Sequence, residues 1–321
     1  MTKQDLIKIL SDTPDKYLSG DFLAKTFGVS RNTIWKHINS LKSEGFTIDA
    51  VKNRGYKLSG QDDVLNSELI IKHLDEPSLF KIECYDVLSS TNTIVKDRSL
   101  ENEGLVVIAN SQEMGVGRLG RNFFSPKNTG IYFSLLLKPT FSNEKTHFIT
   151  SMAGIAVCRA INKLLGLSPK IKWVNDIYLE DKKVCGILTQ GSFSLENNAP
   201  EYIVLGIGVN VYSPTEGFPK DIENIASGLL VQQQGNLRNK LVATIINEFW
   251  VLYNNPNFSD IAIQYKALSF VLGREVTILS AQSTITAKVI DIDDECRLVV
   301  ELEDGKIKKI SSGEIIRSTL T

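Results

Sequence analysis

Apolar residues in the first sixty positions recur at helical spacing in three segments and then alternate in two short ones. An apolar cluster at 6–10 predicts a first helix, and Ser19 caps a second, short helix that carries the apolar residues of 22–27. After a tight turn, Ser30 caps a third helix. Its inward face is predicted to hold three residues spaced four and three apart, Ile34, Ile38 and Leu41. These patterns predict a helix-turn-helix.

Two short strands follow the third helix, at 47–51 and 56–58, and a basic turn at 52–55 joins them. Such a hairpin is typical of the wing of a winged helix-turn-helix, whose basic tip suits phosphate contact. The outer face of the third helix is polar, as a helix in the DNA major groove requires. The residues predicted to contact DNA are Arg31, Asn32, Thr33, Lys36, Asn39, Ser40, Lys52 and Arg54. The alternative is a small helical module with a solvated polar face. Trp35 and His37 are expected to pack rather than to read bases.

The rest of the chain reads as a linker, a mixed body and a small β module. Residues 59–66 are polar and aperiodic, which indicates a linker. In the body, strands are predicted at 105–109, 131–137, 170–173, 183–190 and 203–210, and helices at 147–165 and 237–253. Their irregular order favours an α/β domain with a mixed sheet and helices on one face. Short alternating runs between 275 and 310 predict a C-terminal SH3-like β-barrel. We therefore expect an α+β multidomain protein with domains at 1–62, 63–270 and 271–321.

Charge divides along the chain in a similar way. The 321 residues carry 36 Lys and Arg against 37 Asp and Glu, a formal net charge of −1. Residues 1–60 hold ten basic and six acidic side chains, a net of +4, which leaves 26 and 31, a net of −5, for the rest. A basic first module on an acidic body supports DNA as a partner of that module.

The composition excludes other classes. Hydrophobic residues are 42% and charged residues 23% of the chain, as in ordinary globular proteins. No stretch approaches the roughly 18 apolar residues of a membrane helix, so we expect a cytoplasmic protein with no membrane partner. The four cysteines are scattered, and none forms Cys-x-x-Cys or clusters with the three histidines. No structural zinc site is therefore expected.

Two polar constellations in the first half of the body are candidates for chemistry. The run Ser89–Asn92 either caps a helix, which is favoured when the run is taken alone, or binds a polar ligand. The segment 112–121 combines three glycines, whose backbone amides are open to an anion, with two arginines. It lacks the following helix of a dinucleotide fingerprint and the Gly-Lys-Ser/Thr of a P-loop. We predict a loop that orders over a phosphate; the alternative is a flexible surface loop.

Two further constellations lie near predicted strand ends. In the first, Lys172–Asp176 is followed by Lys183–Leu188. Here Lys172 could pair with a carboxylate or phosphate, and Asp176 could hold a metal or orient a lysine. Solvated strand-end charges and an ordinary Asn-Asp turn are the alternative. In the other, the glycines of Gly206–Asn210 permit close backbone approach, and Asn210 could contact a ribose or phosphate.

In this order, the four constellations resemble those of the biotin protein ligases. With the winged helix in front, the chain resembles the bifunctional form, which is both biotin ligase and biotin operon repressor. The resemblance covers essentially the full length, including Ser312–Ile315 near the C-terminus. The chain departs from the common family pattern at three positions: Val116 replaces an arginine, Phe123 a tryptophan and Val174 a proline.

The resemblance implies a two-step reaction. Biotin attacks ATP to give biotinyl-5′-AMP and pyrophosphate, with Mg²⁺ on the phosphates, and a lysine of a biotin carboxyl carrier domain then takes the biotin. Lys183 and Arg118 would be the catalytic residues. The implied biotin-binding set is Ser90, Thr91, Asn92, Gln112, Gly115, Gly117, Arg118, Lys183 and Gly186. The implied nucleotide-binding set is Arg121, Lys172, Asn175, Asp176, Asn210 and Arg317.

The resemblance also implies a regulatory role. Bound biotinyl-5′-AMP, as corepressor, would favour a homodimer that binds operator DNA and represses biotin synthesis genes. One alternative is a ligand-sensing regulator with an inactive catalytic domain, against which the matching Lys183 and Arg118 argue. The other is a lipoate-type ligase. Against it argue the segment 112–121, called the Gly/Arg loop below, and the winged helix.

Overall fold

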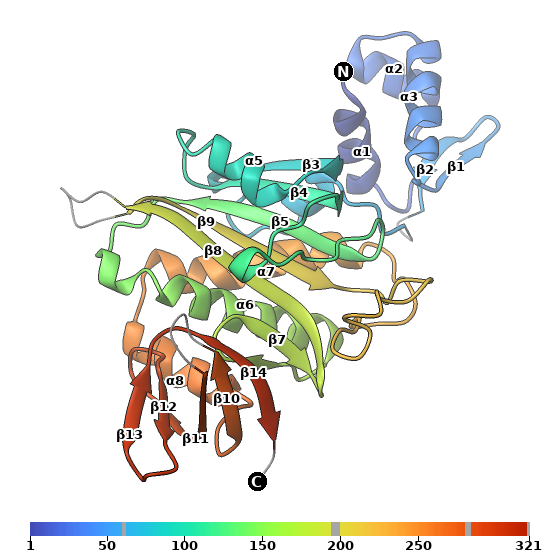
Figure 1. Cartoon of the computed structure of the whole chain (residues 1–321). Coiled ribbons are helices and arrows are strands. Elements are labelled where there is room, and N and C mark those ends of the chain that lie inside the picture. The colour runs from blue at the N-terminus through green and yellow to red at the C-terminus, as the bar shows by residue number, and fades with distance from the viewer. Residues whose placement is uncertain (60–61, 194–199, 280–283, 320–321) are drawn as a thin grey trace. The chain divides into compact units, whose positions relative to one another are not determined.

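The computed structural model describes residues 1–59, 62–193, 200–279 and 284–319, with the backbone alone at 317–319 (Figure 1). It divides into two compact units. The small unit comprises Met1–Pro77 and Gln232–Ala243, and the large unit comprises Ser78–Val231 and Thr244–Thr321. The domain boundaries near residues 62 and 270 stay predictions.

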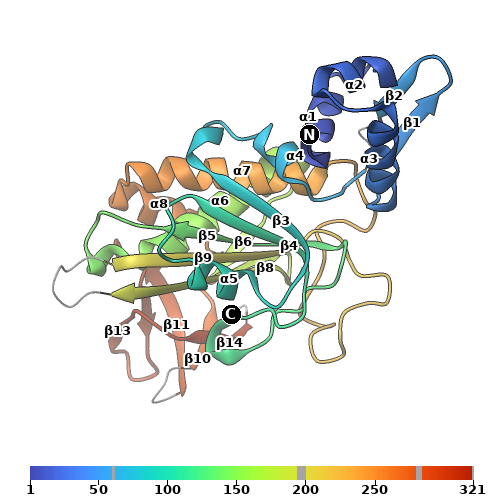
Figure 2. The same cartoon turned by 90° about the horizontal axis from the view of Figure 1, so that it is seen from above.

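The small unit has the predicted winged helix-turn-helix. Its elements are α1 (Lys3–Asp12), α2 (Gly20–Phe27), α3 (Arg31–Ser43), β1 (Ile48–Val51), β2 (Gly55–Leu58) and α4 (Ser67–Ile71). The side chains of Ser19 and Ser30 accept hydrogen bonds from the backbone N–H groups of Phe22 and Thr33, as predicted N-caps should. The wing β1–β2 projects beyond the three helices (Figure 2). The buried core includes Leu6, Leu10, Leu23, Ile34, Ile38 and Leu41.

Residues 62–66 are not the solvated linker that their polarity predicts. Asp63 is buried and forms an ion pair with the buried Arg238, whose Nε lies 3.2 Å from Oδ2 of Asp63. The backbone N–H of Arg238 donates to Oδ1 of Asp63 at 2.8 Å, and that of Asn66 donates to Asn239 at 2.9 Å. The partners lie more than 170 positions away in sequence, so local composition could not indicate them.

The prediction that Trp35 packs is also wrong. Its side chain is 54% exposed, whereas Ile34 and Ile38 beside it on α3 are fully buried. Successive helical residues are turned by about 100°, and this turn takes Trp35 away from the inward face. His37 is partly buried.

The large unit is built on a mixed sheet, as predicted, but the sheet has seven strands rather than the five predicted. Its elements before the C-terminal strands are β3 (Lys81–Leu88), α5 (Thr91–Asp97), β4 (Leu105–Gln112), β5 (Gly130–Leu137), α6 (Phe148–Leu165), β6 (Lys170–Lys172), β7 (Asp176–Leu179), β8 (Lys182–Phe193), β9 (Pro200–Asn210) and α8 (Phe258–Leu268). Helix α7 (Leu237–Asn254) begins in the small unit and ends in the large one. The strand order is β3-β4-β5-β9-β8-β7-β6, and β3 and β7 were not among the five predicted. Strands β3 and β4 are parallel, and the other neighbours are antiparallel.

The helices lie on both faces of this sheet rather than on one. Helix α5 packs on one face, where its Val95 joins a buried cluster with Val107 and Leu136 (Figure 1). Helix α6 lies on the opposite face, and α8 packs against it. The segment Asn143–Leu165, which contains α6, is long and apolar enough to cross a membrane, but 67% of its most apolar window is buried inside the protein. It is therefore the core helix of this face.

The C-terminal strands form one antiparallel sheet and confirm the predicted β module. They are β10 (Glu275–Leu279), β11 (Thr284–Ile292), β12 (Leu298–Glu301), β13 (Ile307–Ile310) and β14 (Glu314–Thr319), in the order β13-β12-β11-β10-β14. Strand β14, which the hydrophobic pattern did not predict, pairs with β10.

Candidate active site

A chain of polar side chains lies where α5 begins, on the face of the sheet that α5 covers. The backbone N–H of Thr91 donates to Oε1 of Gln112 at 2.9 Å, and the Thr91 hydroxyl lies 3.2 Å from the same oxygen. The Ser134 hydroxyl lies 2.8 Å from Oγ1 of Thr91 and 2.6 Å from Oδ1 of Asn92. Nδ2 of Asn92 donates to Gln190 at 3.0 Å. These bonds fix the side chains as a polar wall.

Ser90 shows that this run does more than cap a helix. It stands at the N-cap position of α5, yet its side chain makes no capping hydrogen bond. The residue is buried and lines a cavity together with Thr91 and Asn92. The capping interpretation, favoured from sequence alone, is therefore wrong for Ser90, whose hydroxyl lies at the cavity.

The floor of the cavity consists of glycines, because side chains there would collide with other parts of the site. A Cβ on Gly206 would lie 2.0 Å from Oδ1 of Asn92, and one on Gly208 would lie 2.5 Å from the ring of Phe123. The same ring faces Gly186 of β8. Because side chains alternate along a strand, the side chain of the intervening Ile207 points to the face of the sheet opposite the cavity. This is the close approach predicted for the glycines of β9.

The Gly/Arg loop closes on itself above this floor. The backbone N–H of Gly117 donates to the carbonyl of Arg121 at 2.7 Å, and that of Phe123 donates to Gly115 at 2.8 Å. Between them lies one 3₁₀ turn, Arg118–Gly120. Nη1 of Arg118 donates to Oδ1 of Asn175 at 3.0 Å and to the carbonyl of Gly313 at 3.2 Å. The predicted phosphate loop is thus tied to two other parts of the large unit.

Lys183 and Asp176 form the charged centre of the site. Nζ of Lys183 lies 2.7 Å from Oδ1 of Asp176. This ion pair is the partner of the buried Oδ1 of Asp176. The backbone N–H of Lys183 donates to the carbonyl of Ile225 at 2.7 Å, and the carbonyl of Lys183 accepts from the N–H of Ser227 at 3.0 Å.

Two adjoining cavities meet at these cations. The first encloses the polar wall and the glycine floor, and the second extends toward Phe218 and Ile222. Five residues line both cavities: Gly117, Arg118, Phe123, Asn175 and Lys183. Of the predicted residues, Ser90, Thr91, Asn92, Gln112 and Gly186 line the first cavity alone. Arg121, Asp176 and Asn210 line the second alone.

Two other predicted residues, Gly115 and Lys172, line neither cavity. Gly115 packs against the carbonyl of Phe123, where a Cβ would lie 2.4 Å away, so it shapes the loop rather than the cavity wall. Lys172 lies behind the site, with Nζ 3.4 Å from the Tyr178 hydroxyl, and burial lowers the pKa of Lys172. The side chain of Arg317 lies outside the described residues.

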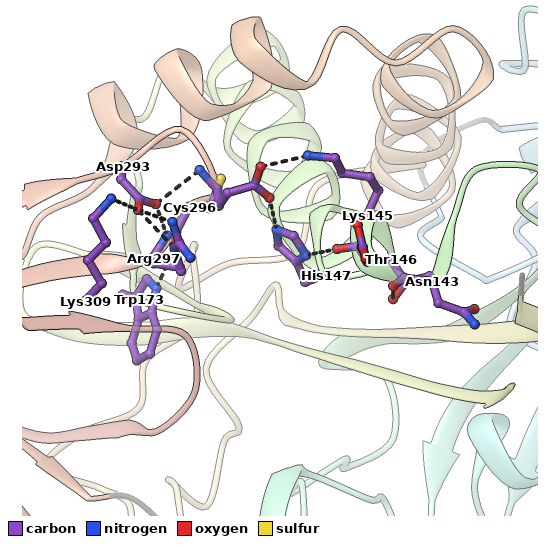
Figure 3. A network of polar contacts seen from close by, with 11 residues as sticks. Asn143, Lys145, Thr146, His147, Trp173, Asp293, Cys296, Arg297 and Lys309 are labelled. Carbon is purple, nitrogen blue, oxygen red and sulfur yellow. Dashed lines mark hydrogen bonds and ion pairs between the residues drawn. The ribbon is translucent and has the colours of Figure 1, made fainter. Parts of the chain in front are cut away.

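The turn that carries Asn175 and Asp176 is braced from behind, as Figure 3 shows for its Trp173. The indole Nε1 of Trp173 donates to the carbonyl of Cys296 at 3.0 Å. From α8, the hydroxyl of Tyr265 donates to the carbonyl of Val174 at 2.9 Å. The connection between β11 and β12 therefore supports the active-site turn through a buried hydrogen bond.

Sequence reasoning missed several wall residues. Ser134 interrupts an otherwise apolar strand, and a hydroxyl within a buried run is the signal that could have found it. Gln190, Ser125 and Phe218 carry no comparable local signal.

Fold and site together define a protein ligase of the biotin and lipoate type that carries a helix-turn-helix domain. The model of the biotin/lipoate A/B protein ligase family matches residues 84–210. A helix-turn-helix domain model matches residues 2–57, and the biotin protein ligase C-terminal domain model matches residues 271–318.

Among these ligases, the chain belongs to the family of bifunctional ligase/repressors. It is 31% identical to the bifunctional ligase/repressor BirA of Bacillus subtilis over 98% of both chains. It is 29% identical to that of Escherichia coli over 97% of this chain and 95% of the relative. Among solved structures, a biotin protein ligase from Aquifex aeolicus in complex with biotin and ATP superposes with a TM-score of 0.60 and 26% identity, over 75% of this chain and 99% of the other.

Proposed function

We propose that the chain joins biotin to ATP and then transfers it to a lysine of a biotin carboxyl carrier domain. The observation that carries this proposal is the pair of cavities that share Arg118 and Lys183. The first cavity offers amides and hydroxyls to the biotin head, and the second has the room and polar rim for the nucleotide. The biotin carboxylate and the α-phosphate of ATP would meet where the cavities join.

The shared cations supply what this reaction requires. Two anions must approach for the carboxylate oxygen to attack the α-phosphorus, form a P–O bond and expel pyrophosphate. Lys183 and Arg118 stand on both cavities and would neutralise the two reactants together. Their positions are set before the ligands arrive, because Arg118 is bonded to Asn175 and the backbone of Lys183 is fixed in the sheet.

The site also fits Mg²⁺ carried by ATP. Asp176 lines the second cavity, and carboxylate oxygen is a ligand that Mg²⁺ prefers. Asp176 would hold the ion through its carboxylate. Bound there with the phosphates, Mg²⁺ would offset part of their charge.

Arg118 is expected to retain the activated intermediate. Its two hydrogen bonds tie the Gly/Arg loop to Asn175 and to Gly313. In Arg118→Gly the loop loses both ties, so biotinyl-5′-AMP should escape and label exposed lysines on bystander proteins. Blotting with streptavidin after incubation with biotin, ATP and serum albumin measures this. Bystander labelling at the wild-type level would contradict the prediction.

Gly206 is expected to be essential for biotin binding, because it leaves room for the polar wall. In Gly206→Ala the new methyl group would collide with the amide of Asn92, which Ser134 and Gln190 already hold in place. The KM for biotin should rise at least about tenfold, the equivalent of 1.4 kcal/mol, while the KM for ATP changes little. Gly20→Ala is the control, because a Cβ on Gly20 would lie at ordinary contact distances of 3.7 Å and 3.8 Å from Tyr56 and Arg31. Equal changes in the KM values for biotin and ATP would contradict the prediction that Gly206→Ala disturbs biotin binding alone.

One experiment separates the substrate classes. The full chain is incubated with ATP, Mg²⁺ and a carrier domain, with radiolabelled biotin in one arm and lipoate in the other. We expect label on the carrier lysine from biotin. Transfer from lipoate alone would overturn the substrate, and transfer from neither would favour the regulator with an inactive catalytic domain.

The small unit would add regulation. We propose a cytoplasmic repressor in which bound biotinyl-5′-AMP favours a homodimer on operator DNA of biotin synthesis genes. The exposed polar side chains of α3 and the basic wing support this role. At the wing, the Arg54 guanidinium stacks 4.6 Å above the Tyr17 ring, which presents a cation at the position predicted for phosphate contact.

A further inference from the structure

Trp35 is the exposed tryptophan of this chain. Of the three tryptophans, Trp173 is 2% and Trp250 is 8% exposed, whereas Trp35 is 54% exposed. The part of a large aromatic side chain that stays in water does not stabilise the fold by burial. Such residues are enriched where proteins bind partners.

Its position on α3 selects the partner. On a helix, residues three and four apart lie on one face. Trp35 is therefore flanked by Arg31 and Asn32 one turn earlier and by Asn39 one turn later, all exposed. These are the side chains predicted to read DNA, and the net charge of +4 over residues 1–60 complements phosphate. Trp35 lies on the edge of that face, between Arg31 and Asn39.

We propose that Trp35 is a specificity-determining residue that packs its indole on the 5-methyl group of a thymine in each operator half-site. Among the base edges of the major groove, thymine presents the apolar group, while the others offer hydrogen-bond donors and acceptors. The broad apolar indole matches that methyl group, and its polar neighbours Arg31, Asn32 and Asn39 suit the adjoining base edges. This inference rests on the proposed DNA-binding function.

The test begins with selection of sites from a randomised duplex library. The full chain with biotin, ATP and Mg²⁺ is compared with Trp35→Ala, Trp35→Phe and Phe22→Ala. Phe22 is a matched control, because it is an exposed aromatic of α2 rather than of α3. We expect the sites selected by the wild type, Trp35→Phe and Phe22→Ala to share a thymine at one position of each half-site. The sites selected by Trp35→Ala should hold any base at that position and be unchanged elsewhere. Circular dichroism and the thermal midpoint confirm that each variant is folded.

Uracil in place of that thymine then isolates the methyl group. It should weaken wild-type binding about four- to fivefold, as expected for one buried methyl group, and leave Trp35→Ala unaffected. The inference alone is overturned if Trp35→Ala selects the wild-type site, if it weakens all sequences equally, or if 7-deazapurines rather than uracil abolish the preference. If the wild type enriches no sequence, the proposed DNA-binding function falls together with the inference.

Discussion

Lys183→Ala should lower biotin-dependent exchange of pyrophosphate into ATP by about 10²–10³-fold, the range seen when one preorganised electrostatic partner of a transition state is removed. In this site Lys183 borders both cavities and pairs with Asp176 at 2.7 Å. Without its ammonium group, the two anions would meet beside an uncompensated carboxylate, and the barrier to attack would rise. The fold should survive, because the backbone bonds to Ile225 and Ser227 do not depend on the side chain.

Lys163→Ala is the matched control for this result. Lys163 also pairs with a carboxylate, that of Glu248 at 3.3 Å, but it lies on α6 and lines neither cavity. Its exchange rate should equal that of the wild type. Transfer of biotin from added biotinyl-5′-AMP gives a second readout, which Lys183→Ala should lose less severely because the first step is bypassed. Normal pyrophosphate exchange in Lys183→Ala would refute the assigned role.

The small unit shows how far local patterns reach. The spacing of Ile34, Ile38 and Leu41 and the two serine caps predicted α2 and α3 because their causes lie within a few residues. The same reasoning treated Asp63 as solvated, since its partner Arg238 is 175 positions away. Sequence shows which residues carry charge, but folding decides which charges are buried.

The large unit shows the corresponding limit for the site. The order of the motifs was sufficient to predict Arg118, Lys183 and Asn175 as site residues, and the structure brings them to one junction. Sequence did not predict that α5 covers the cavity face while α6 covers the other. Nor did it predict the support of the active-site turn by the Cys296 carbonyl, because a backbone acceptor leaves no trace in composition.

Asp63→Ala should produce the largest loss of stability, and it should do so in the small unit. The side chains of Asp63 and Arg238 are each 2% exposed, and the carboxylate accepts from both the backbone and the guanidinium of Arg238. Asp63→Ala breaks this buried ion pair from one side, which costs about 3–5 kcal/mol. Amide hydrogen exchange measures this loss locally. Peptides of α1 and α3 should open more readily by that free energy, while those of α6 in the large unit keep wild-type protection.

Two further variants show whether charge or packing is responsible. Asp21→Ala removes an ion pair with Arg31 whose side chains are mostly exposed, so it should change the opening free energy of the small unit by less than about 1 kcal/mol. The double replacement Asp63→Leu with Arg238→Met removes both charges and fills the space with apolar atoms. It should recover most of the loss, because replacing a whole buried ion pair by apolar residues of similar volume is often neutral or stabilising. If the double variant is as unstable as Asp63→Ala, the hydrogen bonds of Asp63 to the backbone, and not its charge, hold residues 62–66 in place.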